Sequence, residues 1–500
     1  MPTVSHWIDG RAVTDAPTAT QPILNPATGV VIGRVALGDT PEVDAAVASA
    51  TIAAEAWSQV SLSKRAQVLF RFRDLLAGAA EELAAMITRE SGKTLDDAAG
   101  EVARGQEVVE YACGLPTLLK GEFSDQAATG IDVFSTREPL GVVAGITPFN
   151  FPVMVPLWMS PVAIAAGNAF ILKPSERDPS PSLVLARLWH EAGLPNGVFN
   201  VVQGGRTAVD ALLAHPGVAA VSFVGSTPVA RHVHAAATAT GKRVQALGGA
   251  KNHGVVLPDA DLDDAANHLA AAAFGAAGER CMALSVALVA EPVADALVDK
   301  LAAKARAVKV APGDTSGAQM GPVITLAAKA RIEELVESAE EQGAHLVVDG
   351  RRLEVEGCPG GFFVGPTVID GVDPSHRVYV EEVFGPVLCV VRVADLDAAI
   401  NVINANPYGN GTAIFTGSGE AARRFRRSVH VGMIGVNVPI PVPVAWHSFG
   451  GWKDSLIGQS HIYGPEGFDF YTQAKVVTER WPHRGAKAGA SYHFTADSEK

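Results

Sequence analysis

A regular alternation of short apolar runs and amphipathic stretches, which begins at Gly141, constrains the fold of this 500-residue chain most. The runs GVVAGI, NAFILKP, GVFNVVQG and VAAVSFVG are apolar over most of their length, which is typical of strands buried on both faces. Helical candidates lie between them, and two of these end at Gly193 and Gly217, because glycine commonly terminates a helix. This order predicts an α/β fold with a doubly wound parallel sheet.

A second alternating set follows Lys251 and predicts a second α/β domain. Its predicted strands are HGVVLP, LSVALVA, AHLVVDG, VLCVVRV and GTAIFTG. Two domains also fit the length, because a single hydrophobic core rarely grows beyond about 250–300 residues. Upstream, the segment from Pro41 to about Leu119 is predicted to be mostly helical, and the tail from Arg484 is predicted to be a surface extension.

Composition excludes several classes of protein. The formal net charge of −13 argues against nucleic-acid binding, which relies on clustered Lys and Arg. The four cysteines form no CxxC pair, so we expect a reducing, cytoplasmic setting, and the N-terminus does not resemble a signal peptide. The segment Leu140–Leu172 has no charged residue, but its four prolines argue against a membrane span.

One of the four cysteines has an unusual neighbour. The stretch FGAAGERCMALS places Cys281 directly after Arg280, and Gly278 leaves room for a close approach. Because a nearby cation lowers the pKa of a thiol, we predict that Arg280 favours a reactive thiolate at Cys281, although the stretch alone fits a small buried side chain equally well. Most free cysteines are instead small buried side chains. That interpretation applies to the other three, Cys113, Cys358 and Cys389.

Three further motifs follow predicted strands, where doubly wound sheets bind their ligands. TPFNFP places Asn150 in a turn; its amide can donate to a developing oxyanion, although the motif alone also fits an ordinary turn asparagine. In LKPSE, Lys173 and Glu176 are placed to grip ribose hydroxyls or, alternatively, form an exposed pair at a helix start. In FVGST, Gly225 and Ser226 precede a helix whose N-terminus can receive a phosphate.

Together, TPFNFP, LKPSE, FVGST, GERC and EEVFGP stand in the order typical of the NAD(P)-dependent aldehyde dehydrogenase superfamily, which the chain resembles over nearly its whole length. The resemblance implies a Rossmann-type NAD domain, an α/β catalytic domain and a small oligomerisation flap. It implies that Cys281 is the nucleophile and that Asn150, with the Cys281 backbone N–H, forms the oxyanion hole. It further implies an NAD site made by Thr147, Phe149, Lys173, Glu176, Arg177, Gly225, Ser226, Glu382 and Phe384. No metal site is predicted.

The choice between NAD and NADP stays open at this point. Glu176 favours NAD because a carboxylate repels a 2′-phosphate, whereas Lys173 and Arg177 weaken that preference.

The chain departs from the common family pattern at one position. Hydrolytic members carry, in ELGGK, a glutamate that activates water, whereas this chain has ALGGAKNHGVV. Aligned on Lys251 the glutamate position is Leu247, and aligned on LGG it is Ala246. Neither side chain accepts a proton, which removes a contribution of about 10²–10⁴-fold to hydrolysis.

This departure, together with GAKNH, AGERCMALS and IGVNVPIPVP, is similar to the CoA-acylating methylmalonate-semialdehyde (malonate-semialdehyde) dehydrogenases, many of which have Gln where this chain has Glu279. The resemblance implies coenzyme A as acyl acceptor and loss of the substrate carboxylate as carbon dioxide or bicarbonate, giving propionyl-CoA or acetyl-CoA. It also implies a homotetramer or homodimer that serves valine or inositol breakdown. Because such a substrate is an anion, we predict that Arg280 binds it. The resemblance implies the same for Arg104, which matches an arginine that members of this subfamily carry on a helix over the substrate tunnel. Each arginine also fits a solvated surface charge.

We predict three parts in the subunit. They are an NAD-binding domain over residues 1–120 and 140–249, a catalytic domain over residues 250–465, and an oligomerisation flap with a C-terminal arm over residues 121–139 and 466–500.

Two alternative functions stay open. One is a hydrolytic semialdehyde dehydrogenase that makes a free acid with Glu279 as its base. The other is a non-catalytic binding or structural protein on the same fold, against which the joint presence of Cys281, Asn150, Lys173 and Glu382 argues.

Overall fold

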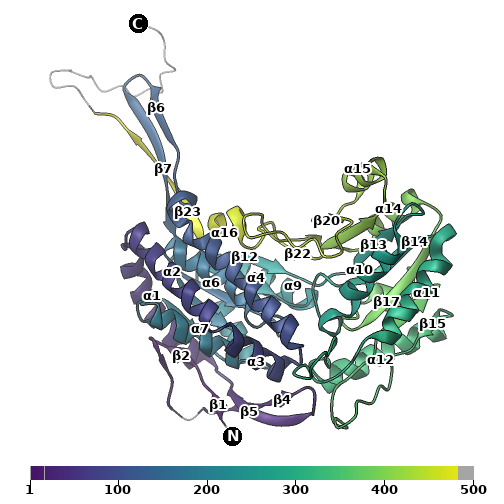
Figure 1. Cartoon of the computed structure of the whole chain (residues 1–500). Helices are drawn as coiled ribbons and strands as arrows, with labels where there is room; N and C mark the ends of the chain where they lie inside the picture. The colour runs from purple at the N-terminus through teal and green to yellow at the C-terminus, as the bar shows by residue number, and fades with distance from the viewer. Residues whose placement is uncertain (1, 16, 482–500) are drawn as a thin grey trace.

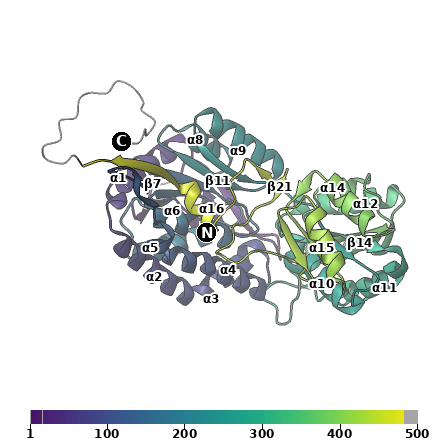
Figure 2. The same ribbon diagram turned by 90° about the horizontal axis from the view of Figure 1, so that it is seen from above.

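The chain forms two α/β lobes, each built on its own sheet (Figure 1). The computed structural model describes residues 2–15 and 17–481, so the tail predicted from Arg484 lies outside the described residues. In Figure 2 the helices labelled α1 to α6, α8 and α9 lie in the first lobe, and those labelled α10, α11, α12, α14 and α15 lie in the second. No helix within the described ranges is long and apolar enough to cross a membrane.

The first sheet has eight strands in the order β22-β12-β11-β8-β9-β10-β2-β3. Its strands are β2 (Trp7–Ile8), β3 (Arg11–Ala12), β8 (Val142–Ile146), β9 (Ala169–Lys173), β10 (Phe199–Val201), β11 (Ala220–Val224), β12 (Arg243–Leu247) and β22 (Leu456–Ile457). The central strands, β8 to β12, run parallel. All five residues of β8 and of β9 are buried, as expected for strands covered by helices on both faces. The predicted doubly wound sheet is confirmed.

Helices cover both faces of this sheet. They are α1 (Thr40–Ser58), α2 (Leu62–Gly78), α3 (Ala80–Ser91), α4 (Leu95–Cys113), α5 (Leu115–Leu118), α6 (Met154–Ala166), α7 (Ser180–Glu191), α8 (Arg206–Ala214) and α9 (Thr227–Ala239). Alternate strand residues enter different cores: Val143 and Phe170 pack on one side of the sheet, and Ala144 and Ile171 on the other.

The second sheet has the order β15-β16-β17-β14-β13-β19-β20 and is parallel except at β15. Its strands are β13 (Asn252–Val256), β14 (Leu284–Ala290), β15 (His345–Val348), β16 (Thr367–Asp370), β17 (Val387–Val393), β19 (Gly411–Phe415) and β20 (Met433–Val436). The helices around it are α10 (Leu262–Phe274), α11 (Glu291–Ala307), α12 (Leu326–Glu341), α13 (Arg377–Val380), α14 (Leu396–Ala405) and α15 (Gly419–Ser428). The five strands predicted after Lys251 all lie in this sheet.

Two three-stranded sheets are separate from the two large sheets. One contains β1 (Thr3–Val4), β4 (Thr20–Asn25) and β5 (Val30–Ala36). The other joins β6 (Phe123–Ala128) and β7 (Ile131–Pro139) to β23 (Thr472–Glu479), which follows α16 (Gly464–Tyr471), and projects from the body (Figure 1). Its role in oligomerisation stays a prediction. A two-stranded pair, β18 (Tyr408–Gly409) and β21 (Trp452–Lys453), completes the fold.

Strand β12 was not among the predicted strands. It begins with an exposed arginine and carries Gln245 in its middle, so it does not form an apolar run. The Gln245 side chain is buried, but both of its polar atoms are bonded, since its oxygen accepts from the Ser222 hydroxyl at 2.7 Å and its nitrogen donates to the carbonyl of His461. At its open edge β12 pairs with β22, so residues 456–457, which we assigned to the catalytic domain, complete the first sheet.

Candidate active site

The predicted motifs converge because they follow neighbouring parallel strands. Thr147 follows β8, Lys173 is the last residue of β9, and Gly225 follows β11. Strands β9, β8 and β11 are adjacent in the sheet and run in the same direction. The three motifs therefore meet at one edge, which is where an open α/β sheet binds ligands.

A cleft of about 1230 Å³ opens at this edge and brings together residues from both lobes. Seven of the predicted site residues line it: Phe149, Asn150, Gly225, Ser226, Cys281, Glu382 and Phe384. The first four come from the first lobe, and the other three from the second. The remaining cofactor residues lie beside it, Lys173 at the end of β9 and Thr147, Glu176 and Arg177 on the loops after β8 and β9.

Polar groups along the first-lobe wall fit a dinucleotide. The Thr147 hydroxyl is buried and has no hydrogen-bond partner among the described residues, so this hydroxyl can form a hydrogen bond with a ligand. The buried Lys173 ammonium pairs with Glu176 at 3.2 Å. Ser226 caps the 13-residue helix α9 without a side-chain bond, which leaves its hydroxyl and the first N–H groups free for a phosphate. These residues would hold NAD.

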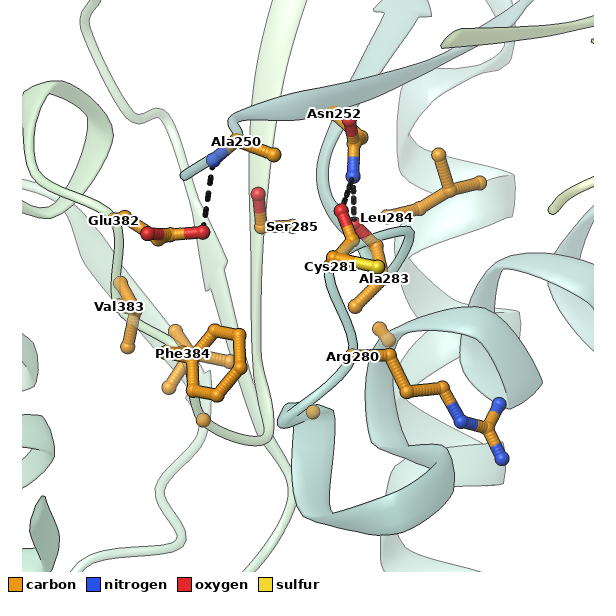
Figure 3. Close-up of a pocket in the computed structure, with 14 residues that line it drawn as sticks. Ala250, Asn252, Arg280, Cys281, Ala283, Leu284, Ser285, Glu382, Val383 and Phe384 are labelled. Atoms are coloured by element: carbon orange, nitrogen blue, oxygen red, sulfur yellow. Dashed lines mark hydrogen bonds between the residues drawn. The ribbon is translucent and has the colours of Figure 1, made fainter. Parts of the chain in front are cut away.

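The second-lobe wall is formed by Glu382 and Phe384. One Glu382 carboxylate oxygen accepts from the Ala250 N–H at 2.9 Å (Figure 3), and burial raises the pKa of Glu382. Gly249 lies against this carboxylate, and a side chain there would collide with it. Arg331 fixes the segment by donating to the carbonyls of Glu382 and Val383 at 2.7 and 3.0 Å. The Phe384 and Phe149 rings pack edge to face, with their centroids 5.9 Å apart.

Several amide side chains hold the segment that carries Cys281. The Asn252 amide donates to the carbonyls of Cys281 and Ala283 at 2.9 and 3.0 Å (Figure 3), and the Asn410 amide donates to the carbonyl of Cys281 at 3.0 Å. Gly278 packs on the backbone of Gly385, where any Cβ would collide with the carbonyl oxygen. The close approach predicted for Gly278 is confirmed, and it joins the Cys281 segment to the EEVFGP loop.

The prediction that Arg280 lowers the pKa of Cys281 is wrong. Burial raises the pKa of this thiol to about 12, and the nearby Glu382 carboxylate adds to the rise. Arg280 does not act on the thiol because its guanidinium forms an ion pair with Asp97, and its side chain extends away from Glu382 and Phe384 (Figure 3). The thiol is therefore the resting form of this side chain. Sequence adjacency alone does not place a cation beside a sulfur.

A hydrogen bond from one of its two amide hydrogens orients the Asn150 side chain. The side chain is 6% exposed, and its nitrogen donates to the carbonyl of Glu279 at 2.9 Å. An amide nitrogen carries two hydrogens. The second one remains for a ligand in the cleft that Asn150 shares with Cys281.

Leu247, rather than Ala246, lies on the Cys281 side of the first sheet. Leu247 belongs to the core cluster against which Cys281 packs, whereas Ala246 belongs to the core on the opposite face. Consecutive strand residues point to opposite faces, so only one of the two candidates can face the thiol. The side that a hydrolytic base would occupy thus carries a leucine.

Arg280 and Arg104 meet in a second pocket of about 1000 Å³, which Phe151 also lines. Residues 150 and 281 line the first cleft, and residues 151 and 280 line the second pocket, so the reactive segment separates the two. Arg104 is paired with Glu107 at 2.8 Å and lies 3.4 Å from the carbonyls of Val442 and Pro443. The structure thus brings the two predicted arginines together and gives each a carboxylate partner.

Sequence reasoning missed three positioning residues, Asn252, Asn410 and Arg331. Asn252 carried a signal, because it is a polar residue at the start of strand β13, whose last three residues are Gly254, Val255 and Val256. Asn410 and Arg331 lie outside every motif, and only the fold brings them to the loops around Cys281 and Glu382.

The fold and the cleft match one known class of enzyme. The model of the aldehyde dehydrogenase family matches residues 13–477, and the chain belongs to this family.

Individual relatives are similar over nearly the full length. The chain is 54% identical over 495 residues to the malonate-semialdehyde dehydrogenase of Pseudomonas aeruginosa, with 99% of each chain covered. The crystal structure of the methylmalonate-semialdehyde dehydrogenase from Oceanimonas doudoroffii matches with a TM-score of 0.96 at 55% identity, covering 97% of this chain and 99% of that one. The crystal structure of a Sinorhizobium meliloti 1021 protein complexed with NAD matches with a TM-score of 0.95 at 51% identity, with the same coverage.

Proposed function

We propose that this enzyme oxidises malonate or methylmalonate semialdehyde with NAD and transfers the acyl group to coenzyme A, giving acetyl-CoA or propionyl-CoA. The observation that carries the acylating step is Leu247, on the Cys281 side of the sheet, where a hydrolytic site needs a base. Semialdehydes of this class appear in the names of the Pseudomonas and Oceanimonas relatives, and NAD is bound in the Sinorhizobium structure.

The chain's own groups have distinct tasks in this reaction. The Cys281 thiol gives up its proton to solvent, and the sulfur attacks the aldehyde carbon. The resulting oxyanion accepts from the Asn150 amide and the Cys281 N–H. NAD, when bound, accepts the hydride that leaves this carbon, and a thioester remains on Cys281. The bond between the substrate's Cα and its carboxylate then breaks. Carbon dioxide leaves, or bicarbonate where water adds to it, and the electron pair left on Cα takes up a proton from solvent. A CoA thiolate then attacks the thioester carbon and displaces the Cys281 sulfur.

Product analysis tests this proposal. Purified enzyme is incubated with malonate semialdehyde, NAD and CoA, and the products are identified by mass spectrometry. We expect acetyl-CoA in amounts equal to the NADH formed. Acetate or malonate as the main product, with CoA unconsumed, would remove CoA from the reaction. A homotetrameric or homodimeric state, a cytoplasmic location and a place in valine or inositol breakdown stay predictions.

The two arginines of the second pocket are proposed to bind the substrate carboxylate. Each already has a carboxylate partner, but a guanidinium has five N–H donors. No bond from the Arg280 Nε or Nη1, or from the Arg104 Nε, occurs within the described residues. These donors remain for an anionic substrate.

Arg104→Leu and Arg280→Leu test that role through a comparison of two aldehydes. Loss of a charge-assisted bond to the substrate carboxylate weakens the binding of the acidic substrate alone, so we expect the KM for malonate semialdehyde to rise by roughly 10- to 100-fold. The KM for propanal should change far less. Steady-state kinetics with both aldehydes measure the two changes in KM. An equal rise for both would assign the arginines to structure.

The hydrolytic alternative requires Glu279 to act as the base, and the geometry argues against it. The side chain is 6% exposed, and one carboxyl oxygen accepts from the Ile324 N–H at 3.3 Å. Burial raises the pKa of Glu279 to about 8, so the carboxyl is mostly protonated at neutral pH. The Glu279 carboxyl is turned toward Ile324 in the second lobe, and Glu279 does not line the cleft, so it does not reach water beside Cys281.

Glu279→Gln is expected to retain CoA-dependent turnover and to stabilise the protein above pH 5. Because the folded-state pKa is raised, the folded chain binds the proton more tightly than the unfolded chain. The contribution of Glu279 to the free energy of unfolding is therefore fully present below the unfolded-state pKa. It falls by up to about 1.4 kcal/mol per pH unit as the pH rises from there to about 8. Glutamine does not titrate, so the Tm difference between variant and wild type should grow from pH 5 to pH 8. A variant that loses turnover would support the hydrolytic alternative.

A further inference from the structure

The segment that leads into Cys281 has an unusual backbone. Ala276 and Ala277 have φ values of 50° and 52°, and Gly278 has a φ of 70°. The turn Gly275–Gly278 is thus left-handed through three successive residues, two of which carry a Cβ. Left-handed backbone is unfavourable for alanine, and such residues persist only where surrounding contacts hold them.

One carboxylate holds both ends of this turn. Asp97, in the first turn of α4, accepts from the Ala276 N–H at 3.1 Å through one oxygen and pairs with the Arg280 guanidinium through the other. Asp97 is itself fixed, because its N–H donates to the Thr94 hydroxyl at 3.2 Å. In the described part of the chain, no other side chain forms a hydrogen bond with residues 275–278.

The turn is built around this contact. Gly275 lies against the Arg280 guanidinium, and an added Cβ would come within 2.6 Å of its Nη1. Ala276 and Ala277 are buried, at 5% and 1% exposed. Beyond the turn, Asn150 holds the Glu279 carbonyl, and Asn252 and Asn410 hold that of Cys281. The backbone conformation of the residues before Cys281 thus depends on the Asp97 carboxylate.

We infer that Asp97 is a positioning residue for the nucleophile: its carboxylate holds the left-handed turn 275–278 and thereby fixes the Cys281 sulfur beside Asn150. The inference rests on the proposed role of Cys281. It also gives Arg280 a second task, because the Asp97–Arg280 pair closes the loop from Ala276 to Arg280. Displacement of reacting atoms by about 1 Å lowers a rate by roughly 100-fold.

The test measures the first turnover of propanal, which lacks a carboxylate, as the rate of NADH formation without CoA. Asp97→Ala should slow it by roughly 10- to 100-fold. Asp97→Asn keeps one acceptor and should fall between Asp97→Ala and wild type. Asp263→Asn removes an exposed first-turn aspartate from α10 and should react as wild type does.

Ala276→Gly separates positioning from general stability. Glycine adopts a left-handed backbone without strain, so the turn then needs the carboxylate less. Added to Asp97→Ala, it should restore the rate several-fold. If Asp97→Ala does not fold, the same comparison is made with Asp97→Asn. A wild-type rate in both Asp97 variants, or a loss that Ala276→Gly does not relieve, would overturn the inference. Cys281→Ala, run in parallel, distinguishes that result from failure of the proposed function: NADH formation by Cys281→Ala overturns the nucleophile itself.

Discussion

Cys281→Ala is expected to abolish aldehyde oxidation while leaving NAD affinity nearly unchanged. The sulfur forms the covalent bond to the substrate, so its removal should lower kcat by roughly 10⁴-fold or more. The groups proposed to hold NAD, such as the Thr147 hydroxyl and the start of α9, lie on the first lobe and do not depend on the thiol. NADH absorbance measures the reaction, and fluorescence titration measures NAD binding.

The other cysteines supply matched controls. Cys113 and Cys389 are buried, and Cys358 is partly buried in a loop of the second lobe. Each of the three Cys→Ala variants should retain activity, with a loss of stability of about 1 kcal/mol at the buried positions. Substantial turnover by Cys281→Ala, or an inactive but folded Cys389→Ala, would place the nucleophile elsewhere.

Much of the two large sheets could be predicted from the sequence because many of their strands are apolar on both faces. The runs that became β8, β9, β11 and β14 contain hydrophobic residues where both faces meet helices. Strand β12 escaped prediction because its buried Gln245 is satisfied by Ser222 and His461, which come from distant parts of the chain. A polar residue can be assigned to a core strand only when its hydrogen-bond partners are known.

The motifs predicted which residues meet in the site, but the sequence did not predict their ion pairs or their pKa values. The strand order brings Asn150, Ser226, Cys281 and Glu382 to one cleft, as the motif positions indicated. The partner of Arg280 could not be read from the sequence, because Asp97 lies 183 residues away on α4. The pKa of Cys281 depends on burial and on Glu382, which only the folded chain places beside it.

Leu247→Glu is expected to create CoA-independent turnover. The leucine is 3% exposed and belongs to the core cluster that Cys281 contacts. A carboxyl buried there would have a raised pKa, which suits a general base near neutral pH. Steady NADH formation without CoA should increase by about 10-fold or more over the variant Leu247→Gln, which has a similar shape but no base.

Leu247→Gln therefore controls for the disturbance of the core, and thermal melting of both variants shows whether they remain folded. Ala246→Glu places the carboxyl on the opposite face of the sheet and should give no CoA-independent turnover. Equal rates for Leu247→Glu and Leu247→Gln in folded protein would mean that position 247 does not face the thioester.

The absence of a base at position 247 is the central claim, and the NADH burst tests it most directly. Wild-type enzyme is mixed with NAD and malonate semialdehyde in a stopped-flow instrument, first without CoA and then with it. Water at the thioester lacks a base, whereas a CoA thiol is partly ionised near neutral pH and needs little help. The account predicts a burst of one NADH per Cys281 followed by slow turnover, and steady turnover with acyl-CoA formation once CoA is added. Rapid, continuous NADH formation without CoA, with a free acid as product, would contradict it.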